Sequence, residues 1–456
     1  MIIIRINNII HKTIPSICSL HARVRVIKYE RVITMKKTFV RILSVILSVS
    51  VIAAFAPLCV ANTDEPSVSG ESAAFTADDM LSAKGKKIVN ARGEEVVLKG
   101  VNLGAWLIFE DWLCPYEEVS DNYEVLETLT ERFGTEKAYE LLNIYYDNFI
   151  TGYDFDYIKS LGFNCVRIPF WFRNFYSDDE GTKILDENGE WDFSRLEWAV
   201  NECSQRGLYV ILDMHGAPGY QSDAPHAGKG LSCGLYEQTE QGEEYRRLTI
   251  ELWQAIALKF KDSPAVAMYD LLNEPMCDVD CTEIKRRQNN EYIYSILYDA
   301  VREVDPDHLI SIECIWTCLA APHKQLKGWD NVVYQVHFYQ NSDFIFNLFV
   351  WITRVWFPDC PLLMGEFFPH KAATWANCFK AMDKYGYSWM LWTYKATGHL
   401  MWSSDWCIMG SKDGFERAKI KTDSFEEIAR KWGECQQTQI GYTDSGHYDK
   451  DVKPVL

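Results

Sequence analysis

The chain has 456 residues, of which 48% are hydrophobic, and its 64 acidic residues outnumber 46 basic ones to give a net charge of −18. This length allows one large core, since a single α/β barrel commonly runs to ~250 residues or more. An acidic surface repels nucleic acid and anionic lipid, so we expect no nucleic-acid partner and no stable membrane contact. The charge suits a soluble monomer that acts on a neutral polymer.

The amino-terminal region differs from the rest of the chain. From Met35, basic residues precede an uncharged and mostly apolar run over 42–56, and small residues follow. This order is typical of a secretory signal peptide, and the run is shorter than the ~20 residues that span a bilayer. We therefore expect a cleaved signal peptide at 35–61 and an extracellular protein, with a retained anchor as the alternative. Residues 1–34 are interpreted as lying upstream of the true start.

The next segment predicts a leader followed by a hairpin. Residues 62–84 are rich in Ser, Ala, Asp and Glu, and we expect them to be flexible. Residues 87–98 predict two short strands around a turn at Arg92-Gly93. Such a hairpin can plug the bottom of a barrel.

Beyond the hairpin, short apolar runs alternate with helical patterns. Most runs are apolar throughout, as expected for parallel strands that are covered on both faces. Eight runs are predicted strands: Val97–Leu103, Asn164–Phe170, Tyr209–His215, Val266–Asn273, Leu309–Cys314, Val332–Tyr339, Pro361–Phe367 and Tyr387–Tyr394. Helices are expected between and after them, including Phe193–Gln205, Glu243–Lys261, Glu283–Glu303, Lys371–Lys384 and Ser424–Trp432.

Eight βα units imply a closed parallel barrel or a doubly wound sheet. No Gly-x-Gly-x-x-Gly motif opens the first βα turn, which argues against a dinucleotide-binding fold. We therefore predict an α/β protein with a single (β/α)₈ TIM barrel and an N-terminal β-hairpin. The catalytic domain is placed at 85–440 and a C-terminal tail at 441–456.

Polar, ionisable and aromatic residues stand at the carboxyl ends of the predicted strands, where the active sites of parallel barrels lie. Among them, Glu274 and Glu366 follow apolar strands into a partly buried setting, where an ionised carboxylate is costly unless it is paired. Two carboxyls in different environments are what glycoside hydrolysis requires, because one donates a proton to the leaving oxygen while the other attacks or assists.

The neighbours of these carboxylates have expected roles. Arg167 is the candidate partner that holds Glu366 ionised, and Tyr339 can hydrogen-bond to the same carboxylate. Asn273 is placed to meet a sugar hydroxyl beside the reacting carbon. We expect the charge of Glu366 to raise the pKa of Glu274, since like charges disfavour a second ionisation.

Seven motifs appear in a fixed order along the chain: Gly100–Gly104, Gly162–Pro169, Asp213–Gly216, Leu272–Pro275, His337–Tyr339, Gly365–Phe367 and Trp389–Lys395. Together they resemble glycoside hydrolase family 5. The run Asn102–Leu107 with Glu110, and the run His215–Gly219, look most like its exo-β-1,3-glucanase branch. The chain lacks the histidines that usually neighbour His337–Tyr339 in that branch, and its loop Ser222–Cys233 is its own.

The resemblance implies a retaining mechanism without a cofactor, with Glu274 as acid/base and Glu366 as nucleophile. It also implies substrate-binding roles for Arg167, His215, Asn273, His337, Tyr339, Trp392, Glu110 and Asn102. We expect no metal, because no cluster of His, Asp and Glu has the spacing of metal ligands.

The predicted substrate is a β-linked oligo- or polysaccharide, with β-1,3-glucan slightly favoured over β-1,4-glucan and both endo and exo action open. A β-mannanase or a glycolipid-directed β-glycosidase is the second enzymatic hypothesis. An inactive glycan-binding protein is a third hypothesis, against which the presence of both glutamates argues. The apolar stretch Phe344–Phe357 predicts a buried barrel helix, with a hydrophobic lip for a lipid or aryl aglycone as the alternative.

Overall fold

The computed structural model describes residues 75–276, 281–313, 321–339, 342–369, 372–397 and 407–456, all within one compact unit, Glu71–Leu456. The predicted signal peptide and the segment upstream of it lie outside these residues. Within the described part of the chain, no helix is both long and apolar enough to span a bilayer.

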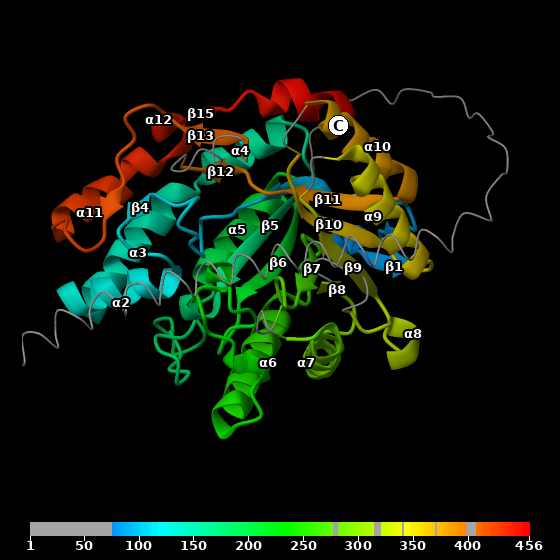
Figure 1. The fold of residues 1–456 in the computed structure, drawn as a ribbon, viewed down its shortest axis with the longest axis horizontal. Coiled ribbons are helices and arrows are strands. Elements are labelled where there is room, and N and C mark those ends of the chain that lie inside the picture. Colours follow the sequence, from blue (N-terminus) through cyan, green and yellow to red (C-terminus); the bar gives the residue numbers. More distant parts are fainter. Residues whose placement is uncertain (1–74, 277–280, 314–320, 340–341, 370–371, 398–406) are drawn as a thin grey trace, which may run out of the picture. The chain divides into compact units, whose positions relative to one another are not determined.

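Eight parallel strands close into a barrel, with neighbours that follow one another along the chain (Figure 1). They are β3 (Lys99–Asn102), β5 (Cys165–Trp171), β6 (Tyr209–Gly216), β7 (Val266–Asp270), β8 (Leu309–Glu313), β9 (Val332–His337), β10 (Leu362–Phe367) and β11 (Tyr387–Leu391). β5 through β11 are buried along their whole length, because helices cover the outside while side chains fill the inside. The predicted TIM barrel and all eight of its strands are confirmed.

Helices surround the barrel (Figure 1). They are α2 (Asn122–Phe133), α3 (Thr135–Phe149), α4 (Gly152–Ser160), α5 (Ser194–Gln205), α6 (Glu240–Phe260), α7 (Glu283–Val304), α8 (Lys324–Lys327), α9 (Asp343–Trp356), α10 (Ala372–Tyr385), α11 (Phe425–Trp432) and α12 (Thr438–Gly441). Side-chain caps fix several starts: Thr239 accepts a hydrogen bond from Gly242 N at α6, and Thr282 accepts one from Lys285 N at α7.

Helix α9 is apolar on two faces. Phe346 and Val350 are buried against the barrel, as expected for a barrel helix. Phe344, Trp351 and Val355 lie on the outer face and are exposed by 67%, 40% and 59%. The prediction of a buried helix therefore holds for the inner face alone.

A hairpin closes the amino-terminal end of the barrel, but its register differs from the prediction. The regular pair is β1 (Ser82–Lys84) with β2 (Lys87–Val89), and only an isolated bridge joins Val89 to Glu95. Residues 75–84 are consequently not part of a flexible leader. Leu81 and Ile88 pack into the apolar lower interior of the barrel, and this burial orders the segment.

The carboxyl-terminal part of the chain is structured as well. β12 (Lys395–Ala396), β13 (Met409–Ser411) and β15 (Tyr442–Asp444) form a small sheet, while β4 (Tyr116–Glu117) pairs with β14 (Ala418–Lys419). Residues 441–456, predicted as a tail, contribute β15, and the side chains of Tyr448 and Val452 are buried. These contacts attach the end of the chain to the rest of the domain.

Candidate active site

Arg167 occupies the centre of the barrel mouth and organises the carboxylates around it. It lies on β5, is fully buried, and places its guanidinium 2.8 Å from Asp270 Oδ2, 3.1 Å from Asp213 Oδ2 and 2.8 Å from Glu366 Oε1. Its NH2 also donates to Asn273 Oδ1 at 2.9 Å. A planar guanidinium with five donors suits such a fan of acceptors.

Glu366 ends β10 and receives two directed hydrogen bonds. Arg167 NH1 donates to Oε1, and the Tyr339 hydroxyl donates to Oε2 at 2.8 Å. The register of β10 shifts between Met364 and Glu366, and such a bulge re-aims side chains at strand ends. Gly365 lets the Gln335 side chain lie against this bend, because a Cβ at this position would lie 2.2 Å from the Gln335 side-chain oxygen.

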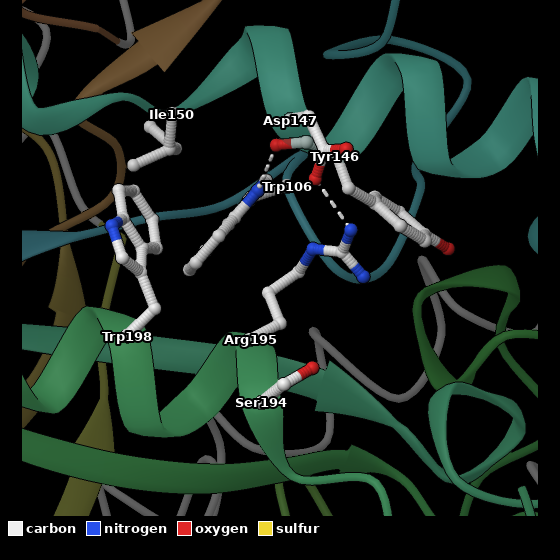
Figure 2. Close-up of a pocket in the computed structure, with 7 residues that line it drawn as sticks. All are labelled: Trp106, Tyr146, Asp147, Ile150, Ser194, Arg195 and Trp198. Carbon is white, nitrogen blue, oxygen red and sulfur yellow. Dashed lines mark hydrogen bonds and ion pairs between the residues drawn. The ribbon is translucent and has the colours of Figure 1, made fainter. Parts of the chain in front are cut away.

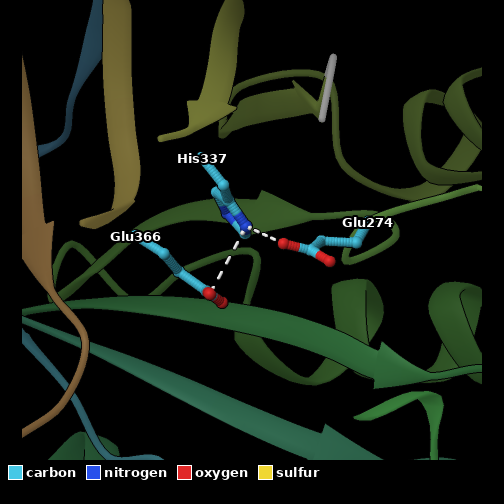
Figure 3. A group of neighbouring side chains, drawn as sticks. All are labelled: Glu274, His337 and Glu366. Atoms are coloured by element: carbon cyan, nitrogen blue, oxygen red, sulfur yellow. Dashed lines mark hydrogen bonds and ion pairs between the residues drawn. The ribbon is translucent and has the colours of Figure 1, made fainter. Parts of the chain in front are cut away.

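Glu274 follows β7 and lies between two histidines. His337 Nδ1 is 2.9 Å from its Oε1, and His226 Nε2 is 3.4 Å from its Oε2. One oxygen of Glu274, one of Glu366 and one ring nitrogen of His337 lie within 4.8 Å of one another (Figure 3). The structure therefore brings together the two carboxyls that the strand ends predicted.

The protonation of this pair differs from the prediction. Burial raises the pKa of Glu274, but the charge of His226 and the hydrogen bond from His337 outweigh it and lower the pKa to about 2. Burial lowers the pKa of His337, whereas the charges of Glu313 and Glu366 and the bond to Glu274 raise it to about 9. The expected rise at Glu274 is wrong because the histidines act more strongly on it than Glu366 does. These opposite shifts favour the form of the pair in which the shared proton is on His337.

His215, Asn273 and Trp392 form one wall of the site. Burial lowers the pKa of His215 well below its usual value, so the neutral ring donates from Nδ1 to Asp213 at 2.7 Å and accepts from Asn273 at Nε2. Trp392 stacks on the His215 ring at 5.3 Å with an interplanar angle of 6°. These contacts fix the orientations of the two rings at this side of the site.

Two predicted substrate-binding residues have different surroundings. Glu110 accepts a hydrogen bond from Trp112 Nε1 at 2.9 Å, and burial, with smaller contributions from the charges of Glu366 and Glu274, raises its pKa to about 8. Asn102 is fully buried, donates to Gly365 O and Leu391 O, and accepts from Arg167. Glu110 therefore faces the carboxylate pair, whereas Asn102 supports Arg167 from below.

Several site residues received no role from the sequence: Asp213, Gln221, His226, Asp270, Glu313 and Gln335. Gln221 joins the ends of β6 and β7 by donating to His215 O and Asn273 O. Asp270 and Gln335 stand on strands between apolar residues, and this interruption is a signal that could have identified them. Glu313 is the last residue of β8, and Glu366 stands one residue before the end of β10, so the strand-end rule would also have selected Glu313.

The cluster of Glu274, His337 and Glu366 could geometrically surround a cation. However, the raised pKa of His337 favours its protonated form, and a protonated ring cannot act as a ligand. Both oxygens of Glu366 already accept hydrogen bonds from Arg167 and Tyr339. The donor set fits proton sharing better than metal binding.

A separate cavity of about 350 Å³ lies between α3 and α5, lined by Trp106, Tyr146, Asp147, Ile150, Ser194, Arg195 and Trp198 (Figure 2). Arg195 and Asp147 form an ion pair there at 2.5 Å, and Trp106 Nε1 donates to Tyr146 O. None of its lining residues belongs to the carboxylate cluster.

Comparisons with known proteins agree with this geometry. Residues 127–398 match the model of the family described as Cellulase (glycosyl hydrolase family 5). A β-xylosidase of Phanerodontia chrysosporium is 30% identical over 261 residues, which are 57% of this chain and 52% of that protein. A probable glucan 1,3-beta-glucosidase A of Aspergillus fumigatus is 28% identical over 252 residues, covering 54% and 56%. The chain spans about half the length of these curated relatives.

Among solved structures, the rutinosidase of Aspergillus niger superposes with a TM-score of 0.52 at 15% identity, covering 73% of this chain and 97% of that one. This likeness concerns the fold alone. The family model, in contrast, covers more than half of the chain and includes Arg167, Glu274 and Glu366. The family expected from the seven motifs is thereby confirmed, and the chain belongs to glycosyl hydrolase family 5.

Proposed function

We propose that this protein is a retaining β-glycosidase that hydrolyses β-glucan by double displacement. The observation that carries the proposal is that one carboxylate oxygen of Glu274 lies within 4.8 Å of one carboxylate oxygen of Glu366 at the mouth of the barrel. Retaining enzymes hold their carboxyls ~5–5.5 Å apart, whereas inverting enzymes need ~6.5–9.5 Å to admit a water molecule. The close pair therefore favours direct attack by one carboxylate.

Glu366 is the nucleophile in this mechanism. Arg167 and Tyr339 each donate to one of its oxygens, which aims the carboxylate and leaves the remaining lone pairs for the anomeric carbon. Attack forms a covalent glycosyl–enzyme ester and breaks the glycosidic bond. Water then cleaves the ester, so that two inversions give net retention.

Glu274 is the acid/base, and His337 supplies its proton. A bound sugar excludes water from the mouth, and a lower dielectric favours a neutral pair over an ion pair. The proton then moves from His337 Nδ1 to Glu274 Oε1 along their 2.9 Å hydrogen bond. Glu274 passes a proton to the leaving oxygen in the first step and takes one from water in the second.

The substrate class rests on charge and on the relatives. A net charge of −18 disfavours acidic polymers, which leaves neutral glycans. Relatives named β-xylosidase and probable glucan 1,3-beta-glucosidase share about 30% identity with the chain, and they make β-1,3-glucan the first substrate to test. The stacked Trp392 and His215 provide an apolar wall for a pyranose face.

The proposal is tested with purified β-1,3- and β-1,4-glucans, a mannan and aryl β-glycosides, with products sized over time. We expect release of short products from β-1,3-glucan, and no effect of a chelator. Glu274→Ala should keep activity on aryl glycosides with good leaving groups, and added azide should restore turnover as the β-glycosyl azide. Binding without turnover on every substrate would instead indicate a glycan-binding protein.

We further propose that the protein is secreted after removal of residues 35–61. The support is the order of basic start, apolar run and small residues in that segment. Intact-mass analysis of protein from the culture medium should give a chain that begins near Asn62. Secreted protein that still carries residues 35–56 would contradict the proposal.

A further inference from the structure

Glu313 is a buried carboxyl group that the double displacement does not use. It ends β8, its side chain has no exposure, and its Oε2 accepts a 2.6 Å hydrogen bond from the backbone N–H of Glu274. Its other oxygen lies 3.4 Å from His337 Nδ1. A fully buried carboxyl is costly, so its contacts on both members of the proton-sharing pair call for a role.

The contact is made where the backbone is strained. Glu274 has a φ of +40°, which non-glycine residues rarely adopt and which the surrounding structure must hold in place. The hydrogen bond from its N–H to Glu313 restrains the peptide that carries the acid/base side chain. Loss of this acceptor would let the carboxyl group of Glu274 move away from the line between His337 and the leaving oxygen.

Glu313 is itself fixed from several elements. The Tyr294 hydroxyl on α7 accepts from Glu313 N at 3.1 Å and lies 3.3 Å from Glu313 O. The charged groups that face its carboxyl are Glu274, Asp270, Arg167 and His337, and burial raises its pKa well above the usual value. An ionised and a neutral carboxyl both present an oxygen to the amide, and a glutamine side chain keeps such an oxygen.

We propose that Glu313 is a positioning residue that orients Glu274 for proton transfer by accepting a hydrogen bond from its backbone amide. This inference rests on the proposed glycosidase function. Because Glu313 acts through the acid/base, its loss should affect only those substrates whose leaving group needs a proton. Glycosides with different leaving groups separate substrates that need this proton from substrates that do not. A dinitrophenolate leaves unprotonated, whereas an alkyl or weakly acidic aryl alcohol does not.

The experiment compares kcat/KM over a series of aryl β-glycosides for two variants of matched size. Glu313→Met fills the site without an acceptor, and Glu313→Gln keeps one. For Glu313→Met we expect a loss of ~100-fold on the poorest leaving group and less than ~3-fold on the dinitrophenyl glycoside, within the range of general acid catalysis. Glu313→Gln should stay within ~3-fold of the wild type on all substrates. Ser311→Ala, on the same strand, is the control. It should change kcat/KM neither on the substrate with the poorest leaving group nor on the dinitrophenyl glycoside.

An equal loss on every leaving group, or the wild-type dependence on leaving-group pKa in Glu313→Met, would overturn the assignment. If Glu313→Met does not fold, Glu313→Asp withdraws the acceptor by one carbon–carbon bond and should steepen the same dependence. If kcat/KM of Glu313→Asp depends on leaving-group pKa as that of the wild type does, this result would also overturn the assignment. Wild-type protein that cleaves none of the aryl glycosides would refute the glycosidase function itself, and that result is distinct from the others.

Discussion

The two ends of the barrel interior are built from the same strands but from opposite chemistry. Near the amino-terminal end the inward side chains are apolar, and on β5, β6, β7 and β9 the side chains two residues further along are polar or charged. The apolar set includes Cys165, Ile211, Met268 and Val333, and the polar set on the same strands is Arg167, Asp213, Asp270 and Gln335. Because inward positions recur every second residue, the interior changes character within one repeat.

This difference separates stability from function. The lower layer packs against Leu81 and Ile88 of the hairpin and excludes water, so it contributes hydrophobic burial. The upper layer holds several acidic groups around Arg167, and burial raises the pKa of both Asp213 and Asp270. The attraction among these buried charges offsets little more than the cost of removing them from water. Their arrangement is therefore explained by the chemistry at the mouth of the barrel.

The sharpest way to test the division is to remove the nucleophile. Glu366→Ala should lower kcat/KM by ~10⁴-fold or more on every substrate, because no leaving group can bypass the attack. Its thermal unfolding midpoint should be equal to or above that of the wild type, since a buried charge is removed. Activity that persists on dinitrophenyl glycosides would contradict the role of Glu366.

The next effect concerns the shared proton. The pKa of His337 is raised to about 9, so the proton that Glu274 needs is present below pH 9 and is lost above it. We expect kcat/KM of the wild type to fall with an alkaline limb near pH 9.

His337→Asn removes one of the two histidines that lower the pKa of Glu274, so this pKa should rise and alone set the alkaline limb. The limb should move to lower pH by more than ~1 unit, and kcat/KM at neutral pH should fall by ~10²-fold. The pH–rate profiles of the two proteins provide the measurement. An unchanged limb would show that Glu274 obtains its proton without His337.

The smallest effects come from two positions on β6. Asp213→Asn removes a partner of Arg167 and His215, and should lower kcat/KM by ~10-fold with little change in unfolding free energy. Ile211→Val should cost about 1 kcal/mol of stability and leave kcat/KM unchanged. Urea unfolding and kinetics on both variants test this contrast. If Asp213→Asn lowers the unfolding free energy as much as Ile211→Val does, the result would contradict the separation of stability from function between the two layers.

Strand periodicity and strand-end chemistry were sufficient to predict the barrel, the carboxylate pair and the partners of Glu366. Apolar runs bounded by Glu274 and Glu366 fix which residues reach the mouth, because parallel strands end at the same face. Of the two histidines on Glu274, His337 stands on a predicted strand, but His226 could not be predicted in the same way. His226 comes from the loop Ser222–Cys233, whose path depends on tertiary packing, and so the pKa of Glu274 was expected in the wrong direction.

The register of the hairpin could not be predicted from the sequence pattern either. Strand-like residues occur on both sides of Lys87–Val89, so the pattern alone does not select its pairing partner. The segment Ser82–Lys84 pairs with it because Leu81 packs into the apolar lower interior of the barrel. Asn102 illustrates the same limit at the mouth. Its motif suggests contact with substrate, but its amide is fully used by Gly365, Leu391 and Arg167.

Proton NMR of the first product released from a β-linked substrate tests the central claim most directly. The close approach of Glu274 and Glu366 predicts double displacement, so the β-anomer should appear first and the α-anomer only later through mutarotation. An initial α-anomer would mean inversion by an activated water molecule. That result would contradict the assignment of Glu366 as the nucleophile.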